Sequence, residues 1–568
     1  MKRLLRKKSI DHIVQELSNS KDTLKKNLTV IDLTSFGIAA VIGAGIFSTI
    51  GKACFSGGPA VIFLFIFTAI ASGFSALCYA EFASRVPASG SAYTYAYTSF
   101  GEIFAWIIGW ALIMEYSIGN IAVSISWSEY FVSLLRNIGI HFPAWLSIDY
   151  KTAYRSFSEG IIHPYTDAWN TAPFILGKRI IFNLPALAIN VIITAIVYLG
   201  IKESKLVGNA MVLLKILVIL MVISVGFFYV DTANWNPFMP NKVYGVMASV
   251  SAVFFAYIGF DAISTTAEEC INPKRDLPRG MIYSLIICTV LYVLLALVLT
   301  GMVSYRFLDV KDPLAFVFNQ RGLNWIGGVI SVSAIVAMTS VLLVFQMGQP
   351  RIWLAMSRDG LMPKRFSKVH STYKTPSFST IITGIVVGIP ILFLDYDIVI
   401  EFTSISTLFA FVLVSGGVLL LPDAVKEKNK FSLPKINSRY ILTAIFVFII
   451  IGLIYYEPNY FSNLVKYTPA DKVFDWFGAK IFMYSDDNVQ KVSLQIFYAI
   501  FAFFVGLSIW KNLSLIPVLG VLSCMYLLTS MNIHNWIYFM IWMVIGLVAY
   551  FSYGIRKSKL NPKNQVVE

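Results

Sequence analysis

The sequence predicts an all-α protein that crosses a membrane many times. Of its 568 residues, 57% are hydrophobic and only 13% are charged, whereas soluble proteins carry about twice that share of charge. The apolar residues gather in uncharged runs of about 20 residues, which is the length of helix that crosses the hydrocarbon core of a bilayer. With the interrupted runs included, the chain has about fourteen such spans.

Several spans contain no charged residue at all. They are Leu33–Gly51, Pro59–Ala80, Ile180–Ile201, Met281–Tyr305, Gly322–Pro350, Thr375–Leu394 and Trp536–Gly554. The 5 cysteines lie in or beside apolar spans without CxxC spacing, so neither a metal ligand set nor a disulfide framework is expected. The basic start runs into a polar stretch rather than an apolar core with a cleavage site, so the first span is expected to direct insertion.

Positive charge gathers in the segments that join the spans on one side. These segments are Lys2–Lys26, Lys202–Lys205, Asn272–Arg279, Arg351–Lys374, Lys426–Arg439 and Arg556–Lys559. The longer segments on the other side, Arg136–Lys178, Asp231–Lys242 and Glu457–Gln490, are mixed in sign. Because cytoplasmic loops are enriched in Lys and Arg, both ends of the chain are predicted to be cytoplasmic. These basic loops account for the net charge of +14, so the charge does not indicate a nucleic-acid partner.

Four regions follow from this pattern. We predict a cytoplasmic N-terminal segment at 1–28, a ten-helix core at 29–425 with repeats at about 29–230 and 243–425, four accessory spans at 426–555, and a cytoplasmic tail at 556–568. The spans of the core contain Gly, Ser and Thr and the few charged residues that lie inside spans. The functional residues are therefore expected in the core. The accessory spans are expected to face lipid or a small membrane partner, and their extracellular loop 457–490 has room for a short helix.

The first span contains Gly43-Ala44-Gly45 midway along its length. Glycine lowers helix propensity by about 1 kcal/mol per residue, and unwound backbone at membrane depth is tolerated only where it is buried in protein or lines a cavity. The alternative, close helix packing, is disfavoured because residues two apart do not share a helix face. We predict a break whose freed N–H groups suit a carboxylate.

The sixth span, Val243–Thr266, contains Gly259 near its middle and a carboxylate, Asp261, at similar depth. It lies five spans after the first and runs in the opposite direction, as in an inverted five-helix repeat. A site between the two breaks is therefore predicted. Amides from the first span would bind a carboxylate, and carbonyls from the sixth would accept from an ammonium group. A free α-amino acid satisfies both.

Lys215 lies inside the span Leu206–Val230, roughly 13 Å from its predicted cytoplasmic end at 1.5 Å per residue. A charged lysine at this depth costs at least a few kcal/mol. We expect its amine to bind the carbonyls exposed by the break in the first span. Two roles fit this position. Lys215 either holds the coupling proton and releases the broken helix when deprotonated, or is a permanently charged strut.

Glu115 is the other carboxylate inside a span, and it either relays protons or pairs with a neighbouring helix. Glu401 begins a later span and is expected to be solvated. The motifs HExxH, GxSxG and GxxxxGK[ST] are absent from the sequence, and the 5 histidines fall in tails, loops or at a span end. An enzyme is therefore not expected, and neither a metal nor a cofactor is expected beyond a proton as coupling ion.

Three groups of residues resemble the amino acid–polyamine–organocation superfamily, and within it the cationic amino acid transporter family with its bacterial members. They are Gly43-Ala44-Gly45-Ile46-Phe47, then Ile258-Gly259-Phe260-Asp261 followed by Glu268-Glu269 and Asn272-Pro273, and finally Gly348-Gln349-Pro350-Arg351 through Met356–Pro363. The resemblance covers nearly the whole chain from Leu28. It implies a LeuT-like 5+5 inverted repeat with four further transmembrane helices at the C-terminal end.

The resemblance also implies roles for individual residues. The substrate carboxylate would be bound at Ile42, Gly43, Ala44 and Gly45, and the amino group by carbonyls of Phe255, Ala256 and Ile258, close to Asp261. Lys215 matches a lysine that replaces a sodium ion in proton-coupled relatives. Phe345 matches a position at which members that take cationic substrates have a small residue. It therefore favours neutral amino acids, unless it is only a packing residue.

The leading hypothesis is a secondary active transporter of the plasma (inner) membrane. It takes up neutral L-amino acids with a proton by alternating access. The alternatives are transport of arginine, lysine or ornithine, and amino-acid exchange.

Overall fold

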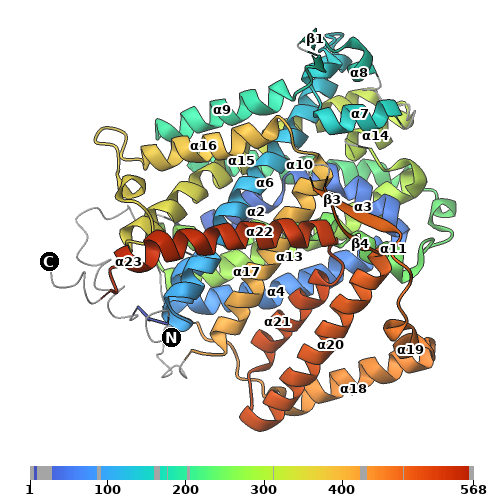
Figure 1. Cartoon of the computed structure of the whole chain (residues 1–568). Coiled ribbons are helices and arrows are strands. Elements are labelled where there is room, and N and C mark those ends of the chain that lie inside the picture. The colour runs from blue at the N-terminus through green and yellow to red at the C-terminus, as the bar shows by residue number, and fades with distance from the viewer. Residues whose placement is uncertain are drawn as a thin grey trace.

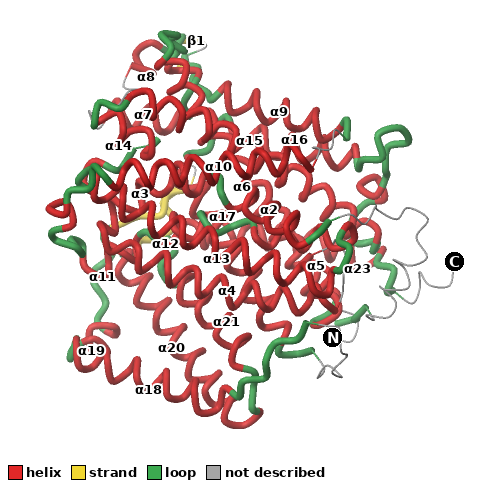
Figure 2. The backbone as a smooth tube through the Cα atoms, turned by 180° about the vertical axis from the view of Figure 1, so that it is seen from behind, coloured by secondary structure: helices red, strands yellow, loops and turns green. Residues whose placement is uncertain are grey.

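The computed structural model describes residues 5–8, 28–85, 91–158, 167–175, 177–200, 205–310, 312–421, 431–476 and 479–561. Most of the predicted N-terminal segment 1–28, three residues of the 202–205 turn and the end of the tail lie outside these ranges. The described chain is almost entirely helical (Figures 1 and 2).

The first part of the described chain contains a broken span. Its helices are α2 Val30–Val41, α3 Ile50–Gly57, α4 Val61–Arg85, α5 Ser91–Ser99, α6 Glu102–Asn137, α7 Tyr150–Ser158, α8 Asp167–Thr171, α9 Leu184–Tyr198 and α10 Lys205–Phe227. A π-helical turn, η1 Gly45–Thr49, lies between α2 and α3, and 3-10 turns lie at η2 Gly58–Ala60 and η3 Ala144–Leu146. Between α8 and α9 lies a short antiparallel hairpin whose strands, β1 Phe174–Ile175 and β2 Lys178–Arg179, have 2 residues each.

The next part of the chain contains a second broken span. Its helices are α11 Lys242–Ala248, α12 Val250–Phe255, α13 Pro273–Met302, α14 Pro313–Gln320, α15 Asn324–Arg358, α16 Ser377–Ile391 and α17 Tyr396–Val418. A long 3-10 segment, η5 Phe260–Glu269, follows α12, and shorter ones are η4 Thr232–Trp235, η6 Tyr305–Phe307 and η7 Lys364–Ser367.

The last part of the chain contains α18 Ser438–Tyr456, α19 Tyr460–Val465, α20 Asp486–Lys511, α21 Leu515–Leu528, α22 Ile533–Ala549 and α23 Ile555–Lys557, with a π-helical turn, η8 Tyr550–Gly554, between the last two. The predicted short helix in loop 457–490 is confirmed as α19. The same loop also forms an antiparallel hairpin of β3 Lys472–Trp476 and β4 Ala479–Tyr484, which the prediction of an all-α chain missed.

Within the described residues, ten helical stretches are long and apolar enough to cross a membrane, and four shorter helices of 12 to 15 residues, α2, α9, α16 and α21, are also apolar. The protein is therefore a multi-pass helical membrane protein. Burial separates its helices into an inner and an outer set. The most apolar stretch of the α6 span is 89% buried and that of Val250–Ala267 is 94% buried, against 11% for α18 and 17% for α20.

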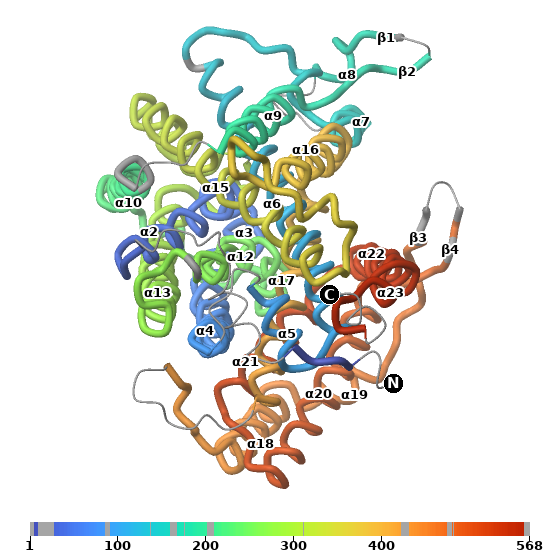
Figure 3. Tube along the Cα trace, turned by 90° about the vertical axis from the view of Figure 1, so that its left-hand side faces the viewer, coloured from blue at the N-terminus to red at the C-terminus, as the bar shows by residue number. Residues whose placement is uncertain are grey.

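The inner set surrounds α6, which packs against α15 and α17, while α13 packs against α2 and α4 (Figure 2). The four C-terminal spans do not form one uniform layer. α21 packs against α17 and α4. The indole of Trp542 in α22 stacks on Trp110 of α6 with ring centroids 4.7 Å apart. Only α18 and α20 remain peripheral, as Figure 3 shows.

Both ends of the described chain meet at one end of the helix bundle (Figure 1). The carbonyl of Arg6 accepts a hydrogen bond of 2.8 Å from the N–H of Glu102. The Lys8 amine lies 3.0 Å from the Asp359 carboxylate, and the Asp359 carbonyl accepts from the N–H of Lys559 at 3.0 Å. The two ends of the described chain therefore lie at the same end of the helix bundle.

Candidate functional site

The predicted interruption of the first span is confirmed. Helix α2 ends at Val41, Ile42 has an extended backbone with ψ 95, and the helix resumes at η1. The first N–H groups of a new helical segment have no acceptor within the segment. Among the described residues, the N–H groups of Gly43, Ala44 and Gly45 donate to no backbone carbonyl. Three adjacent donors are thus available at the centre of the molecule.

The amine of Lys215 caps the end of α2. Lys215 is 0% exposed, and its Nζ donates to the carbonyls of Ala39 and Ile42 at 2.9 Å each. The predicted contact with the exposed carbonyls is therefore confirmed. A cation at a helix C-terminus is also favoured by the helix dipole. The carbonyl of Val41, which lies between Ala39 and Ile42 in the chain, accepts a hydrogen bond of 3.1 Å from the Tyr292 hydroxyl of α13. The sequence did not predict this contact.

The sixth span is interrupted at the same depth as the first. Helix α12 ends at Phe255, Gly259 has a φ of 116°, and a 3-10 segment follows. The two interruptions touch. A Cβ on Gly259 would lie 2.9 Å from the Ala40 carbonyl oxygen, and a Cβ on Gly45 would collide with the Ala256 backbone. The glycines thus allow the two broken helices to cross without side chains between them.

The carbonyls at the second break are not equally available. The Phe255 carbonyl already accepts from the N–H of Ile258 at 3.3 Å. Those of Ala256 and Ile258 accept no backbone hydrogen bond in the part of the chain that the structure describes. Of the three carbonyls that the sequence singled out, two therefore remain as free acceptors next to the three free donors of the first break.

Asp261 and Glu115 form a pair of buried carboxylates beside the crossing. They are 2% and 4% exposed and lie close enough to interact electrostatically. One oxygen of each, Oδ2 and Oε2, has no hydrogen-bond partner among the described residues, and neither have the hydroxyls of Tyr79 and Tyr116 nearby. A buried polar atom without a partner is costly, so this cluster has capacity to bind a proton or a polar ligand.

Phe345 of α15 lies on the side of this cluster. Its ring contacts Tyr116 edge-on with centroids 5.6 Å apart, and a Cβ on Gly119 would lie 2.9 Å from it. Val341, one turn away on the same helix, packs against Gly43, where a Cβ would lie 2.6 Å from its Cγ2. The contacts agree both with a pocket wall and with simple packing.

The site is closed on both sides in this conformation. Each residue that the sequence assigned to it is at most 6% exposed wherever a side-chain value is given. Toward one end, the Lys52 amine of α3 lies 2.7 Å from the Asp397 carboxylate of α17. Toward the other end, Arg351 lies 3.3 Å from Glu269, and the N–H of Leu28 donates to the Glu269 carbonyl at 3.1 Å.

Glu401, which the sequence predicted to be solvated, is half-buried and has partners of its own. Its carboxylate accepts hydrogen bonds from the side chains of Asn532, at 2.9 Å, and Asn535 in α22. The sequence could not place α22 beside the start of α17.

Within the described ranges, no group of three or more His, Cys, Asp or Glu side chains is placed to hold a metal ion.

Known proteins resemble the chain along almost its whole length. Residues 28–470 match the model of a family described as amino acid permease, and residues 513–558 match a model of the C-terminus of such permeases. The chain is similar to a branched-chain amino acid permease, BcaP, of Bacillus subtilis, with 37% identity over 98% of this chain and 99% of the relative.

Two other relatives are named for different substrates. A methylthioribose transporter of Bacillus subtilis is 42% identical over 78% of this chain and 91% of its own length. Human cationic amino acid transporter 4 is 30% identical over 96% of this chain and 90% of its own length. The family match and the full-length similarity lead to one conclusion: the chain belongs to the amino acid permeases of the amino acid–polyamine–organocation superfamily.

Proposed function

We propose that this permease is a proton-coupled importer of neutral L-amino acids that works by alternating access. The observation that supports it most is the crossing of two broken helices, where three free N–H donors lie beside free carbonyls and a buried amine. This arrangement matches the two ends of an α-amino acid and calls for no catalytic side chain. The protein is therefore proposed to transport its ligand unchanged.

The proposed architecture is a LeuT-like 5+5 inverted repeat in the ten-helix core, with four further spans and about fourteen in total. Its support is that the interrupted spans begin each half and contact each other at their breaks. We further propose that both termini face the cytoplasm and that the protein resides in the plasma (inner) membrane. A small membrane partner on the accessory spans stays a prediction.

In the proposed complex, the substrate carboxylate accepts from the N–H groups of Gly43, Ala44 and Gly45, after Ile42. Its ammonium group donates to the carbonyls of Ala256 and Ile258, with Phe255 as a further neighbour and Asp261 close by. Hydrogen bonds to a charged group contribute about 1.5–3 kcal/mol each. Several such bonds in a site closed to water would select α-amino acids over compounds that lack one of the two charges.

Lys215 is the proposed site of the coupling proton. When charged, its amine holds the carbonyls of Ala39 and Ile42 and so fixes the end of α2. When the proton leaves, the attraction of the charge for these carbonyls is lost and α2 can move. Glu115, with its free oxygen near Asp261, is a second proposed proton carrier. The alternative role, pairing with a neighbouring helix, is supported by the contact of Glu115 with Thr407 in α17.

The test is uptake of radiolabelled compounds into proteoliposomes with and without a pH gradient. The panel contains the twenty amino acids, ornithine and methylthioribose. Accumulation of branched-chain or other neutral amino acids that stops on adding an uncoupler is expected. An exchanger would behave differently. It would show counterflow with equal substrate concentrations on both sides and no pH gradient, and it would not accumulate substrate when a pH gradient is applied. Preferential uptake of arginine or lysine would replace the proposed substrate class.

The Phe345→Ser variant should widen the substrate range. Removing the ring would lengthen the space beside Tyr116 and Gly119, so cationic or longer side chains should be admitted. A site with room for one or two more methylenes gains about tenfold in selectivity toward the longer substrate. Competition of unlabelled arginine and phenylalanine against labelled leucine measures this. Val329→Ser on the exposed face of the same helix is the control, and an unchanged profile in Phe345→Ser would remove Phe345 from the pocket wall.

A further inference from the structure

A large groove separates the peripheral helix α18 from the core. It has a volume of about 990 Å³ and runs between α18 on one side and α4 and α11 on the other, with α20 and α21 behind it. Figures 2 and 3 show α18 at the edge of the molecule, packed against α20 and α21. The groove is remote from the crossing of the broken helices, so it does not belong to the site described above.

The groove changes character along its length. One end is apolar and is lined by Phe74, Ile445 and Phe501, among others. On α18 it extends from Ile445 to Tyr456, which corresponds to about 17 Å at 1.5 Å per residue. That is close to half of the roughly 30 Å hydrocarbon thickness of a bilayer. The groove therefore spans one leaflet, from its middle to its surface.

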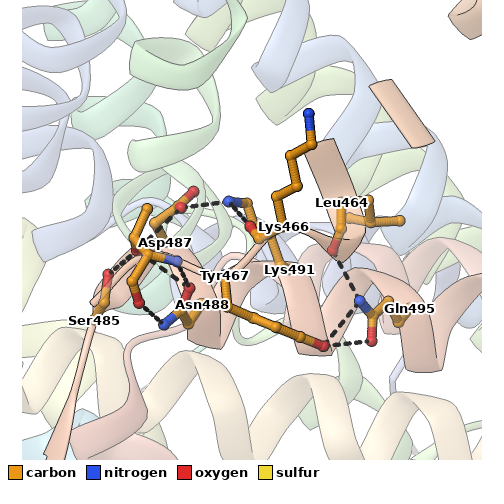
Figure 4. A network of polar contacts seen from close by, with 9 residues as sticks. Leu464, Lys466, Tyr467, Ser485, Asp487, Asn488, Lys491 and Gln495 are labelled. Atoms are coloured by element: carbon orange, nitrogen blue, oxygen red, sulfur yellow. Dashed lines mark hydrogen bonds and ion pairs between the residues drawn. The ribbon is translucent and has the colours of Figure 1, made fainter. Parts of the chain in front are cut away.

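The other end of the groove is polar and contains charges of both signs. Glu457, Asp487 and Lys491 line it, together with Asn463 and Gln490. The Lys491 amine donates to the Lys466 carbonyl at 2.7 Å and to the Asp487 carboxylate at 2.6 Å (Figure 4). The Glu457 carboxylate forms no ion pair within the described ranges. The end of the groove thus has two carboxylates against one amine.

A second set of contacts holds this polar end in place. The Gln495 amide donates to the Leu464 carbonyl at 2.8 Å (Figure 4). The Asn488 amide donates to the Thr468 carbonyl at 2.7 Å. These bonds join α20 to α19 and to the segment that follows α19. The polar groups are therefore fixed at the surface end of the groove rather than carried by a free loop.

We propose that this groove binds one glycerophospholipid with a zwitterionic ethanolamine headgroup. Its acyl chains follow α18 and α4, its phosphate faces Lys491, and its ammonium group faces Glu457 and Asp487. The excess of carboxylates disfavours an anionic headgroup. The leaflet is the one on the side of loop 457–490.

The test compares lipid retention by two glycine variants. Gly452 lines the groove, and a Cβ there meets no atom within 4 Å, so Gly452→Phe places an aromatic ring in the groove. Gly506 on α20 is equally open but lies outside the groove, so Gly506→Phe is the matched control. The full-length protein is purified in detergent, freed of lipid, and titrated with phosphatidylethanolamine or phosphatidylglycerol. Bound lipid is counted by native mass spectrometry.

Each buried methylene contributes about 0.8 kcal/mol to lipid binding, so losing two of them weakens binding by roughly tenfold. Gly452→Phe should therefore retain at least about tenfold less phosphatidylethanolamine, whereas Gly506→Phe should match the unchanged protein. Glu457→Gln should reduce the preference for phosphatidylethanolamine over phosphatidylglycerol while leaving the fold intact. Equal retention by the two glycine variants, or equal binding of the two lipids to the unchanged protein, would overturn the proposal.

Discussion

Lys215→Ala is expected to abolish accumulation driven by a pH gradient. The substitution removes two charge-assisted hydrogen bonds to the carbonyls of Ala39 and Ile42, each of which contributes about 1.5–3 kcal/mol. If Lys215 binds the coupling proton, the variant should still exchange labelled for unlabelled substrate across the membrane. The variant should no longer transport protons together with the substrate. Uptake and internal pH, followed in the same proteoliposomes, measure both quantities.

The control for Lys215 is Tyr292→Phe, which removes the neutral hydrogen bond to the Val41 carbonyl and leaves the amine in place. A loss of about 0.5–1.5 kcal/mol should slow transport without uncoupling it. If Lys215 were only a strut, Lys215→Ala would lose exchange and thermal stability together. Persistent uptake along the pH gradient in Lys215→Ala would disprove the coupling role.

Gly259→Ala is expected to reduce uptake by at least an order of magnitude. Gly259 has a φ of 116°, and an L-residue forced into such backbone costs of order 1–3 kcal/mol. Its Cβ would in addition lie 2.9 Å from the Ala40 carbonyl oxygen, which would push the broken helices apart and move the carbonyls of Ala256 and Ile258. Labelled uptake and the melting temperature of the purified protein should both fall.

Gly328→Ala is the matched control for Gly259→Ala. Gly328 lies in α15, and a Cβ there meets no atom within 4 Å. Replacing a helical glycine by alanine at such a position should be neutral or slightly stabilising. Uptake by Gly259→Ala at the level of this control would show that the crossing of the two helices is not needed for transport.

The sequence predicted the centre of the molecule better than its periphery. The break at Gly43–Gly45 and the contact of Lys215 with carbonyls followed from local chemistry, because glycine weakens a helix and a buried amine requires acceptors. The role of Tyr292 did not follow, since a buried tyrosine must have a partner but its identity depends on how α13 packs against α2. The direct contact of Gly259 with Ala40 also depends on the three-dimensional crossing.

Contacts between distant segments explain the remaining errors. Trp110 and Trp542 stack although 432 residues separate them, so the sequence could not show that α22 belongs beside α6. The start of the same helix provides the partners of Glu401, since Asn535 lies in α22 and Asn532 directly precedes it. The β3–β4 hairpin was missed because its strands are 5 and 6 residues long and lie between helices, where short alternating patterns are a weak signal.

The closure of the central site on both sides has a thermodynamic consequence for any cargo. A zwitterion that enters such an enclosure must shed its hydration shell, and moving charged groups out of water is expensive unless protein dipoles replace the lost solvent. In the proposed complex, peptide groups at the two helix breaks provide that replacement only for the carboxylate and ammonium groups, which all amino acids share. The side chain gains no such compensation, so apolar side chains, which have little hydration to lose, are the least costly to enclose.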